Sequence, residues 1–370
     1  MRKQVVFSFT LLFLLIFQQG LAQTIANLKD YAQSIDFKYK TGFLLAHRES
    51  MAHLPMSHFH SFEMTYNFES RGHRGWEQAH NNPKFGISAL VMLNANQEVL
   101  GNSYGLSGRV TLPKRNWGRN KNWYWLNDMS FGLGYLERKF DLLENPKNVA
   151  IGSHVNLLII LGTEFQYRNE NRYVSLGIDF THFSNSGTIK PNLGLNIPSI
   201  RVGVGFMTKT QSFHDEIIPF DRADLELVIF GAASLKNNYE FQKQLFPVFG
   251  LSTHLTKAQG KRFRYAYGLD LTYNEANRNF ITSPLNQSIW RTAQIGIYNG
   301  WELDINKCVF FVGMGAYLHN RVNPFGWFYH RFGGRYHFGK KWYWHGSVRS
   351  HWAKADFFET GLGYRISIRQ

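Results

Sequence analysis

The chain has 370 residues, of which 44% are hydrophobic and 16% aromatic, with 33 glycines and a formal net charge of +15. Its one cysteine, Cys308, excludes an internal disulfide, and we expect this side chain to be a small buried or lipid-facing hydrophobe. No recognised nucleic-acid module or concentrated basic run accompanies the positive charge, so nucleic acid is not an expected partner.

The first 22 residues have the pattern of a secretory signal peptide. Two basic residues precede an apolar run over residues 5–17, and small residues lead to Ala22. The run is too short to span a bilayer. We therefore expect cleavage near Ala22 and export of the chain. No linker or low-complexity stretch divides the remainder, so residues 23–370 are predicted to form a single domain, with residues 23–35 as a periplasmic lead-in.

From about residue 36 onward, apolar residues alternate with polar or small ones, which is the period of a β-strand. Residues 153–167, 197–207 and 360–370 show this pattern. In the stretch 172–185, one face is apolar and the other polar: Val174, Leu176, Ile178 and Phe180 against Ser175, Gly177, Asp179 and Thr181. The polar faces are rich in Gly, Ser, Asn and Thr, as is typical of the inside of a closed barrel.

Aromatic residues gather at three predicted strand ends, residues 122–128, 326–330 and 340–346, and resemble the interfacial girdles of membrane barrels. Backbone groups in a bilayer must all be paired, so a spanning sheet has to close on itself. The sequence therefore predicts an all-β fold: one antiparallel transmembrane β-barrel with an even strand number between 12 and 16. We expect it in the outer membrane of a Gram-negative bacterium, with residues 70–83 and 274–287 as loops.

The stretch THFSNSGTIKPNLGLN, residues 181–196, ends one predicted strand and begins the next. His182 and Ser184 continue the apolar, lipid-facing side of their strand, and Asn196 has the same parity on the following strand. Polar side chains facing lipid lose hydration free energy unless they pair with each other or lie at the interface. The turn between the strands is expected to bring the three together at the rim of the apolar band.

These residue types can carry out acyl transfer. Ser184 is the candidate nucleophile, His182 its base, and Asn196 the group that holds the imidazole. Asn185, Asn192 and the Gly187 N–H are candidate donors to the oxyanion. A hydrogen-bonded His and Ser at an ordinary hairpin tip is the alternative reading of the same stretch.

The histidines and basic residues outside this stretch are interpreted without a catalytic role. Four histidines that could suggest metal binding are interpreted as loop and rim residues: His47, His53, His58 and His60. No metal and no cofactor are expected. Lys190, Arg71 and Arg74 are loop residues that could contact lipid phosphates or form a solvated rim.

With these residues identified, the sequence resembles the lipid A 3-O-deacylases, which are grouped with bacterial acyloxyacyl hydrolases. The motif HFSN followed by PNLGLN resembles their active-site signature, and residues 134–156 and 328–366 also look like members of this group. The resemblance is densest over residues 84–207. It implies an outer-membrane barrel that cleaves acyl esters of lipid A, with the family's catalytic Ser and His carried over onto Ser184 and His182.

One position departs from the family. The third residue, twelve after the serine, is typically Glu, and here it is Asn196. Outer-membrane phospholipase A is similar in having His-x-Ser with Asn at that offset, but Gly187 stands where that enzyme has an Arg in its calcium site, so the resemblance implies no required metal.

We therefore expect an outer-membrane carboxylic ester hydrolase that removes a fatty acyl chain from lipid A of lipopolysaccharide. Two alternatives remain at this point: a phospholipase A-like enzyme acting on glycerophospholipids, and a non-catalytic barrel that serves as a pore or structural protein. A homodimer is left open.

Overall fold

The computed structural model describes residues 30–117, 122–220, 222–237, 244–280, 288–322, 325–352 and 354–368. The expected signal peptide and most of the expected lead-in fall outside these ranges. The end of the lead-in does not, and residues 32–35 already belong to the first strand.

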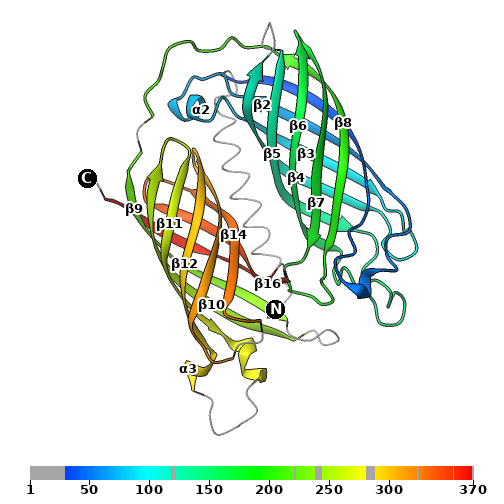
Figure 1. Cartoon of the computed structure of the whole chain (residues 1–370), viewed down its shortest axis with the longest axis vertical. Coiled ribbons are helices and arrows are strands. Elements are labelled where there is room, and N and C mark those ends of the chain that lie inside the picture. The colour runs from blue at the N-terminus through cyan, green and yellow to red at the C-terminus, as the bar shows by residue number, and fades with distance from the viewer. Residues whose placement is uncertain are drawn as a thin grey trace.

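Sixteen antiparallel strands form two closed barrels of eight, side by side in Figure 1. The first barrel contains β1 (Ala32–Gly42), β2 (Phe59–Glu69), β3 (Lys84–Leu93), β4 (Ser103–Trp117), β5 (Trp123–Leu136), β6 (Val155–Asn169), β7 (Arg172–Ser184) and β8 (Leu195–Lys209). The second contains β9 (Leu225–Asn237), β10 (Leu245–Gln259), β11 (Phe263–Asn274), β12 (Ala293–Ile305), β13 (Cys308–Asn320), β14 (Phe328–His337), β15 (Trp342–His351) and β16 (Lys354–Ile368).

The expectation of one barrel with 12 to 16 strands is wrong. β1 pairs with β8 along its length and β9 pairs with β16, so each half of the chain closes on itself. Residues 210–224 join the two barrels, in a region where no dividing linker was expected.

Helical turns are confined to the connections. They are η2 (Glu49–Met51), α2 (Gly75–Ala79), η3 (Glu275–Phe280) and α3 (Ile289–Thr292). α2 lies inside the predicted loop 70–83, and η3 lies at the start of the predicted loop 274–287, whose residues 281–287 are outside the described ranges. Among the described residues, no helix has the length and apolarity needed to cross a membrane.

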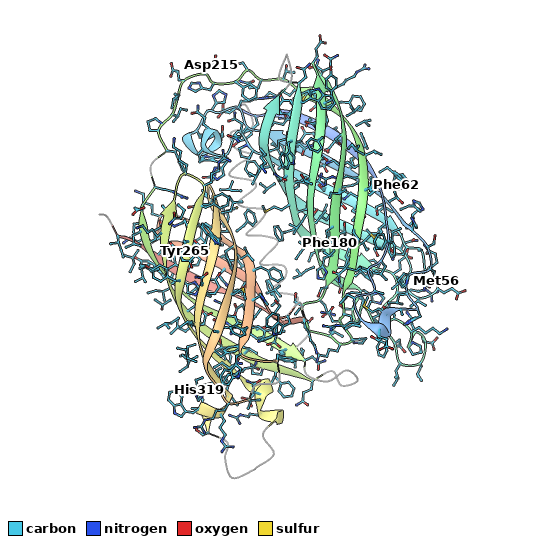
Figure 2. The ribbon with its side chains drawn as sticks, viewed as in Figure 1. Met56, Phe62, Phe180, Asp215, Tyr265 and His319 are labelled. Carbon is cyan, nitrogen blue, oxygen red and sulfur yellow. The ribbon has the colours of Figure 1, made fainter. Side chains whose placement is uncertain are left out.

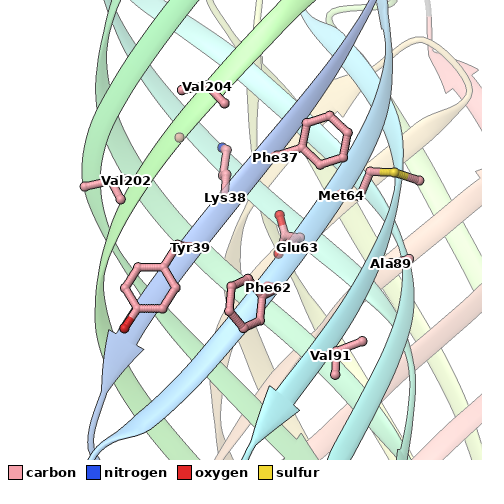
Figure 3. Close-up of a pocket in the computed structure, with 11 residues that line it drawn as sticks. Phe37, Lys38, Tyr39, Phe62, Glu63, Met64, Ala89, Val91, Val202 and Val204 are labelled. Carbon is pink, nitrogen blue, oxygen red and sulfur yellow. The ribbon is translucent and has the colours of Figure 1, made fainter.

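Alternate side chains point to opposite sides of each wall, as the period of two predicts. Figure 3 shows this on β1 and β2, where Phe37 and Phe62 lie on the outer wall while Lys38 and Glu63 turn into the barrel. The outer residues line a shallow apolar groove across β8, β1, β2 and β3. On β7 the predicted apolar face is the outer one, because Leu176 is 58% exposed and Asp179 only 5%.

The interior of each barrel is filled with paired charges. In the first, Lys40 lies 2.7 Å from Glu63 and 2.8 Å from Asp179, and Arg109 also contacts Glu63. In the second, Arg331 lies 2.9 Å from both Asp270 and Glu359. An eight-stranded barrel is only wide enough for its own side chains. Side chains of the described residues therefore fill the space inside each barrel that a channel would need.

Candidate active site

The candidate residues lie at one end of the first barrel, which we call the site end. It carries the connections 43–58, 94–102, 137–154 and 185–194. Sixteen buried apolar residues close the barrel interior there, and we call them the apolar plug: Leu44, Met51, Leu54, Phe59, Leu90, Met92, Val99, Leu100, Leu136, Ala150, Ile151, Leu158, Ile160, Phe183, Leu195 and Ile197.

The plug fixes the strands that carry the site. Phe183 lies between His182 and Ser184 in the sequence and is fully buried inside the barrel. Leu195 and Ile197 flank Asn196 on β8 and are fully buried in the same cluster. Because successive side chains on a strand point to opposite faces, anchoring these residues inside directs their neighbours to the outer wall.

His182 and Asn196 are direct cross-strand partners. The Nδ1 atom of His182 lies 2.6 Å from Oδ1 of Asn196, and both side chains are partly buried. An amide oxygen at this position accepts a hydrogen bond from the Nδ1–H group and leaves Nε2 unprotonated, which is the tautomer that a general base needs. The structure thus brings together two of the three predicted site residues.

Ser184 is on the same face of β7, two residues beyond His182, a spacing of about 7 Å along a strand. Ser184 as a whole is 6% exposed, and its hydroxyl forms hydrogen bonds within the β7–β8 loop. Nδ2 of Asn192 donates to Oγ at 2.9 Å, and the Ser186 N–H donates to it at 3.1 Å. In this conformation the serine oxygen contacts these donors rather than the imidazole of His182.

The other two predicted oxyanion donors serve the loop itself. The Gly187 N–H donates to Oδ1 of Asn185 at 3.1 Å. Nδ2 of Asn185 donates to Oγ of Ser153 at 3.0 Å and to the carbonyl of Ile189 at 2.8 Å. The structure therefore directs Asn192 and the Ser186 N–H at the serine oxygen, and it uses Asn185 and Gly187 to shape the turn.

Two contacts at the site were not anticipated from the sequence. The Ser186 N–H reaches Ser184 Oγ in the turn after β7, where Ser186 itself has a positive φ of 54°, and no sequence pattern identified that turn. His47, assigned to the loop and rim group, lies 3.1 Å through Nδ1 from Nδ2 of Asn196. These two residues are 149 positions apart, so no local spacing could have linked them.

Several other polar residues are distant from the site or occupied elsewhere. Arg71 and Arg74 lie in the β2–β3 connection at the opposite end of the barrel, so they cannot meet a lipid bound at Ser184, whereas Lys190 is in the β7–β8 loop. His53 contacts the Lys147 carbonyl at 2.8 Å, and His60 contacts the Tyr39 hydroxyl at 2.7 Å. Within the described ranges, no group of three or more His, Cys, Asp or Glu side chains could hold a metal ion.

Comparisons with known proteins divide the chain as the barrels do. Residues 60–205, from β2 to β8, match the family described as Lipid A 3-O-deacylase (PagL). Residues 223–368, which contain β9 to β16, match the family described as Acyloxyacyl hydrolase, C-terminal domain. Among curated proteins, no sequence matches this chain.

Solved structures with a similar arrangement include two that span about half of the chain. Neisserial surface protein A (NspA) is 9% identical, covers 47% of this chain and 96% of its own, and has a TM-score of 0.33. The outer membrane enzyme PagL is 12% identical, covers 45% of this chain and 97% of its own, and has a TM-score of 0.31. The two family matches together contain the candidate site and all or most of every strand except β1, and the chain belongs to the lipid A 3-O-deacylase (acyloxyacyl hydrolase) family of outer-membrane ester hydrolases.

Proposed function

We propose that Ser184, His182 and Asn196 carry out lipid A deacylation on the outer wall of the first barrel. The observation that supports this most directly is the 2.6 Å contact between His182 Nδ1 and Asn196 Oδ1, with the serine on the same outward face two residues away. A histidine oriented in this way is the arrangement that activates a serine hydroxyl.

The position of the site suits a lipid of the outer leaflet. Outer-membrane barrels have short periplasmic turns and longer extracellular loops. In the first barrel the longer connections, 43–58 and 137–154, are at the site end, while β6 and β7 are joined at the other end by residues 170 and 171 alone. We therefore assign the site end to the cell exterior, where lipid A resides.

The acyl chain of such a substrate would lie against the outer wall below Ser184. On β7 the residues beneath the site are Ile178 and Phe180, which are 59% and 37% exposed. Figure 2 shows Phe180 on this wall. On β6 the partner of Ser184 is Leu157, and the partner of His182 is Ile159. These side chains provide an apolar surface that leads to the hydroxyl.

In the proposed reaction, Nε2 of His182 takes the proton of the Ser184 hydroxyl as Oγ attacks the ester carbonyl. The imidazolium then gives this proton to the departing alkoxide oxygen of the ester, which leaves as an alcohol, and an acyl-serine remains. Water, activated by the same Nε2, attacks the acyl-serine, the proton returns to Oγ, and the fatty acid is released. Asn196 fixes the tautomer but carries no charge to stabilise the imidazolium.

The oxyanion of each tetrahedral intermediate needs fixed donors beside the nucleophile. Nδ2 of Asn192 and the Ser186 N–H both touch Ser184 Oγ in the present conformation. We propose that these two donors pass to the substrate oxygen when Ser184 turns towards His182. The rate enhancement from one such donor is on the order of a hundredfold or more.

The decisive experiment uses purified wild type and Ser184→Ala with lipid A as substrate, analysed by mass spectrometry. The variant should fold and leave the acyl chains in place, because no other oxygen nucleophile occupies its position. Ser212→Ala, an exposed serine in the segment between the barrels, is the matched control and should retain full activity. Deacylation by Ser184→Ala at the wild-type rate would refute the assignment.

The same assay with a glycerophospholipid in place of lipid A tests the phospholipase alternative, for which the asparagine at position 196 is the one supporting feature. If only the phospholipid loses acyl chains, the substrate assignment changes to a glycerophospholipid, while the assignment of Ser184, His182 and Asn196 stands. The pore alternative has no support in the structure, since the interiors of both eight-stranded barrels are filled by ion-paired side chains.

A further inference from the structure

The side-chain amide of Asn196 has a second partner beyond His182. Its Oδ1 atom lies 2.6 Å from His182 Nδ1, and its Nδ2 atom lies 3.1 Å from His47 Nδ1. The three side chains form a chain that runs from the outer face of β7 across β8 to the connection between β1 and β2.

An amide differs from a carboxylate in a way that makes this second contact matter. Both oxygens of a carboxylate accept hydrogen bonds, so a glutamate or aspartate side chain that rotates by 180° still presents an acceptor to the imidazole. An asparagine whose amide group rotates by 180° presents its NH₂ group to the imidazole instead of its oxygen. His182 would then have to accept at Nδ1 and keep its proton on Nε2, which is the wrong tautomer for a base, and that error is costly in a serine hydrolase.

We propose that His47 is a positioning residue that holds Asn196 in the productive orientation. In the tautomer that carries the proton on Nε2, Nδ1 of His47 accepts a hydrogen bond from Nδ2 of Asn196 at 3.1 Å, in preference to its longer 3.4 Å contact with the Leu45 carbonyl oxygen. This leaves Oδ1 of Asn196 facing His182. This inference rests on the proposed function and explains how an amide serves where the family usually has a carboxylate. Among the described residues, His47 contacts Asn196 and makes no hydrogen bond with Ser184.

The backbone around His47 is tied to the strand that carries Asn196. The Leu45 N–H donates to the carbonyl of Asn196 at 2.8 Å, and the Phe43 N–H donates to the carbonyl of Pro198 at 3.4 Å. Leu44, between them, is 2% exposed and belongs to the apolar plug. The His47 N–H in turn donates to the Leu45 carbonyl at 3.0 Å. The imidazole of His47 therefore approaches the amide from an anchored segment.

The first test compares kcat and KM for wild type, His47→Ala and His47→Asn in lipid A deacylation. We expect His47→Ala to lower kcat by roughly tenfold or more, with KM changing by less than about twofold, because an interaction that orients the base acts on the chemical step. His47→Asn places an acceptor oxygen near the site of Nδ1 and should restore most of the loss. Equal kcat values for His47→Ala and wild type, or equal losses in His47→Ala and His47→Asn, would overturn the proposal.

The second test repeats the His47→Ala substitution in an Asn196→Asp background. A carboxylate needs no orientation, so the tenfold loss should shrink to about twofold or less, and the two substitutions should be non-additive. The same fold-loss in both backgrounds would show that His47 merely supports the local structure and would overturn the inference. If Ser184→Ala retains activity, the proposed function itself fails; if only the His47 variants match wild type, the catalytic assignment stands and this inference falls.

Discussion

At the scale of single residues, the imidazole of His182 depends on a glycine for its space. Gly194, in the turn before β8, has a φ of +81°, and a Cβ atom built on it would lie 2.9 Å from Cε1 of His182 and 3.1 Å from the Phe183 carbonyl oxygen. The first atom belongs to the imidazole proposed as the base, and the second to the backbone that holds it. A side chain here would displace the base or the turn.

Gly194→Ala should therefore lower the deacylation kcat by roughly tenfold or more while the barrel still folds, since a small misplacement of a catalytic group is enough to slow the reaction strongly. Gly339→Ala is the matched control. It has a similar φ of +88° but no neighbour within 4 Å of the added Cβ, so it carries the same backbone penalty without the clash. Similar kcat values for the two variants would contradict this account.

At the scale of elements, the β7–β8 loop is supported by the second barrel as well as by its own hydrogen bonds. The carbonyl of Gly187 accepts a hydrogen bond at 3.4 Å from the N–H of Asn237, at the end of β9. A Cβ atom on Gly187 would lie 2.8 Å from the backbone oxygen of Asp356, near the start of β16. The segment that presents the Ser186 N–H to the nucleophile thus fits closely against the neighbouring barrel.

Gly187→Ala is expected to push this loop away from β16 and to reduce kcat, because the Ser186 N–H would no longer meet Ser184. Its φ of +81° again makes Gly339→Ala the control for backbone strain. The readout is the rate of phosphonylation of Ser184 by a serine-directed phosphonate, which reports the site without lipid binding. A phosphonylation rate equal to that of the control would mean that the second barrel does not position the loop.

The sequence predicted the elements of the site better than their contacts. Parity along β7 and β8 placed His182, Ser184 and Asn196 on one outward face, because side-chain alternation is a local property of a strand. The distribution of hydrogen bonds in the loop was not predictable, since Asn185 bonds Ser153, which is 32 positions away. His47 reaches Asn196 only because β1 closes on β8, and that closure is a property of the whole barrel.

At the scale of the molecule, the alternating pattern predicted the barrel wall and failed on the number of barrels. A strand in a barrel of eight has the same outward apolar and inward polar residues as a strand in a barrel of sixteen, so periodicity carries no information on closure. The local evidence lay in residues 210–224, which lack the alternation and connect β8 to β9. The small polar residues of the inner faces fit a narrow barrel with a packed interior equally well.

The two barrels contact each other at both ends and along the wall. At the end opposite the site, Nη2 of Arg262 in the β10–β11 turn lies 2.8 Å from Oδ1 of Asn81 beside α2. Along the wall, the rings of Phe131 on β5 and Phe310 on β13 stack with centroids 5.6 Å apart. At the site end, the Gly187–Asn237 contact completes the set. Because matching ends meet, the two barrels run in the same direction.

This arrangement predicts a specific crosslink. Cysteines replacing Phe131 and Phe310, in a Cys308→Ala background, should be joined by a short bismaleimide, because the two aromatic rings stack directly. A protease site is inserted in the exposed segment around Phe213 and Ile217, which are 52% and 89% exposed. Cleavage there separates the two halves of the chain unless the crosslink joins them. We expect one band at the full mass on a denaturing gel after cleavage.

The control pairs the cysteine at position 131 with one replacing Leu251 on β10, which is equally lipid-facing at 51% exposure but three strands around the barrel from β13. It should yield two separate halves after cleavage. Equal crosslinking of both pairs would indicate barrels that rotate freely against each other in the membrane. In that case the second barrel could not hold the β7–β8 loop in a fixed position, and the effect expected for Gly187→Ala would have to arise within the first barrel alone.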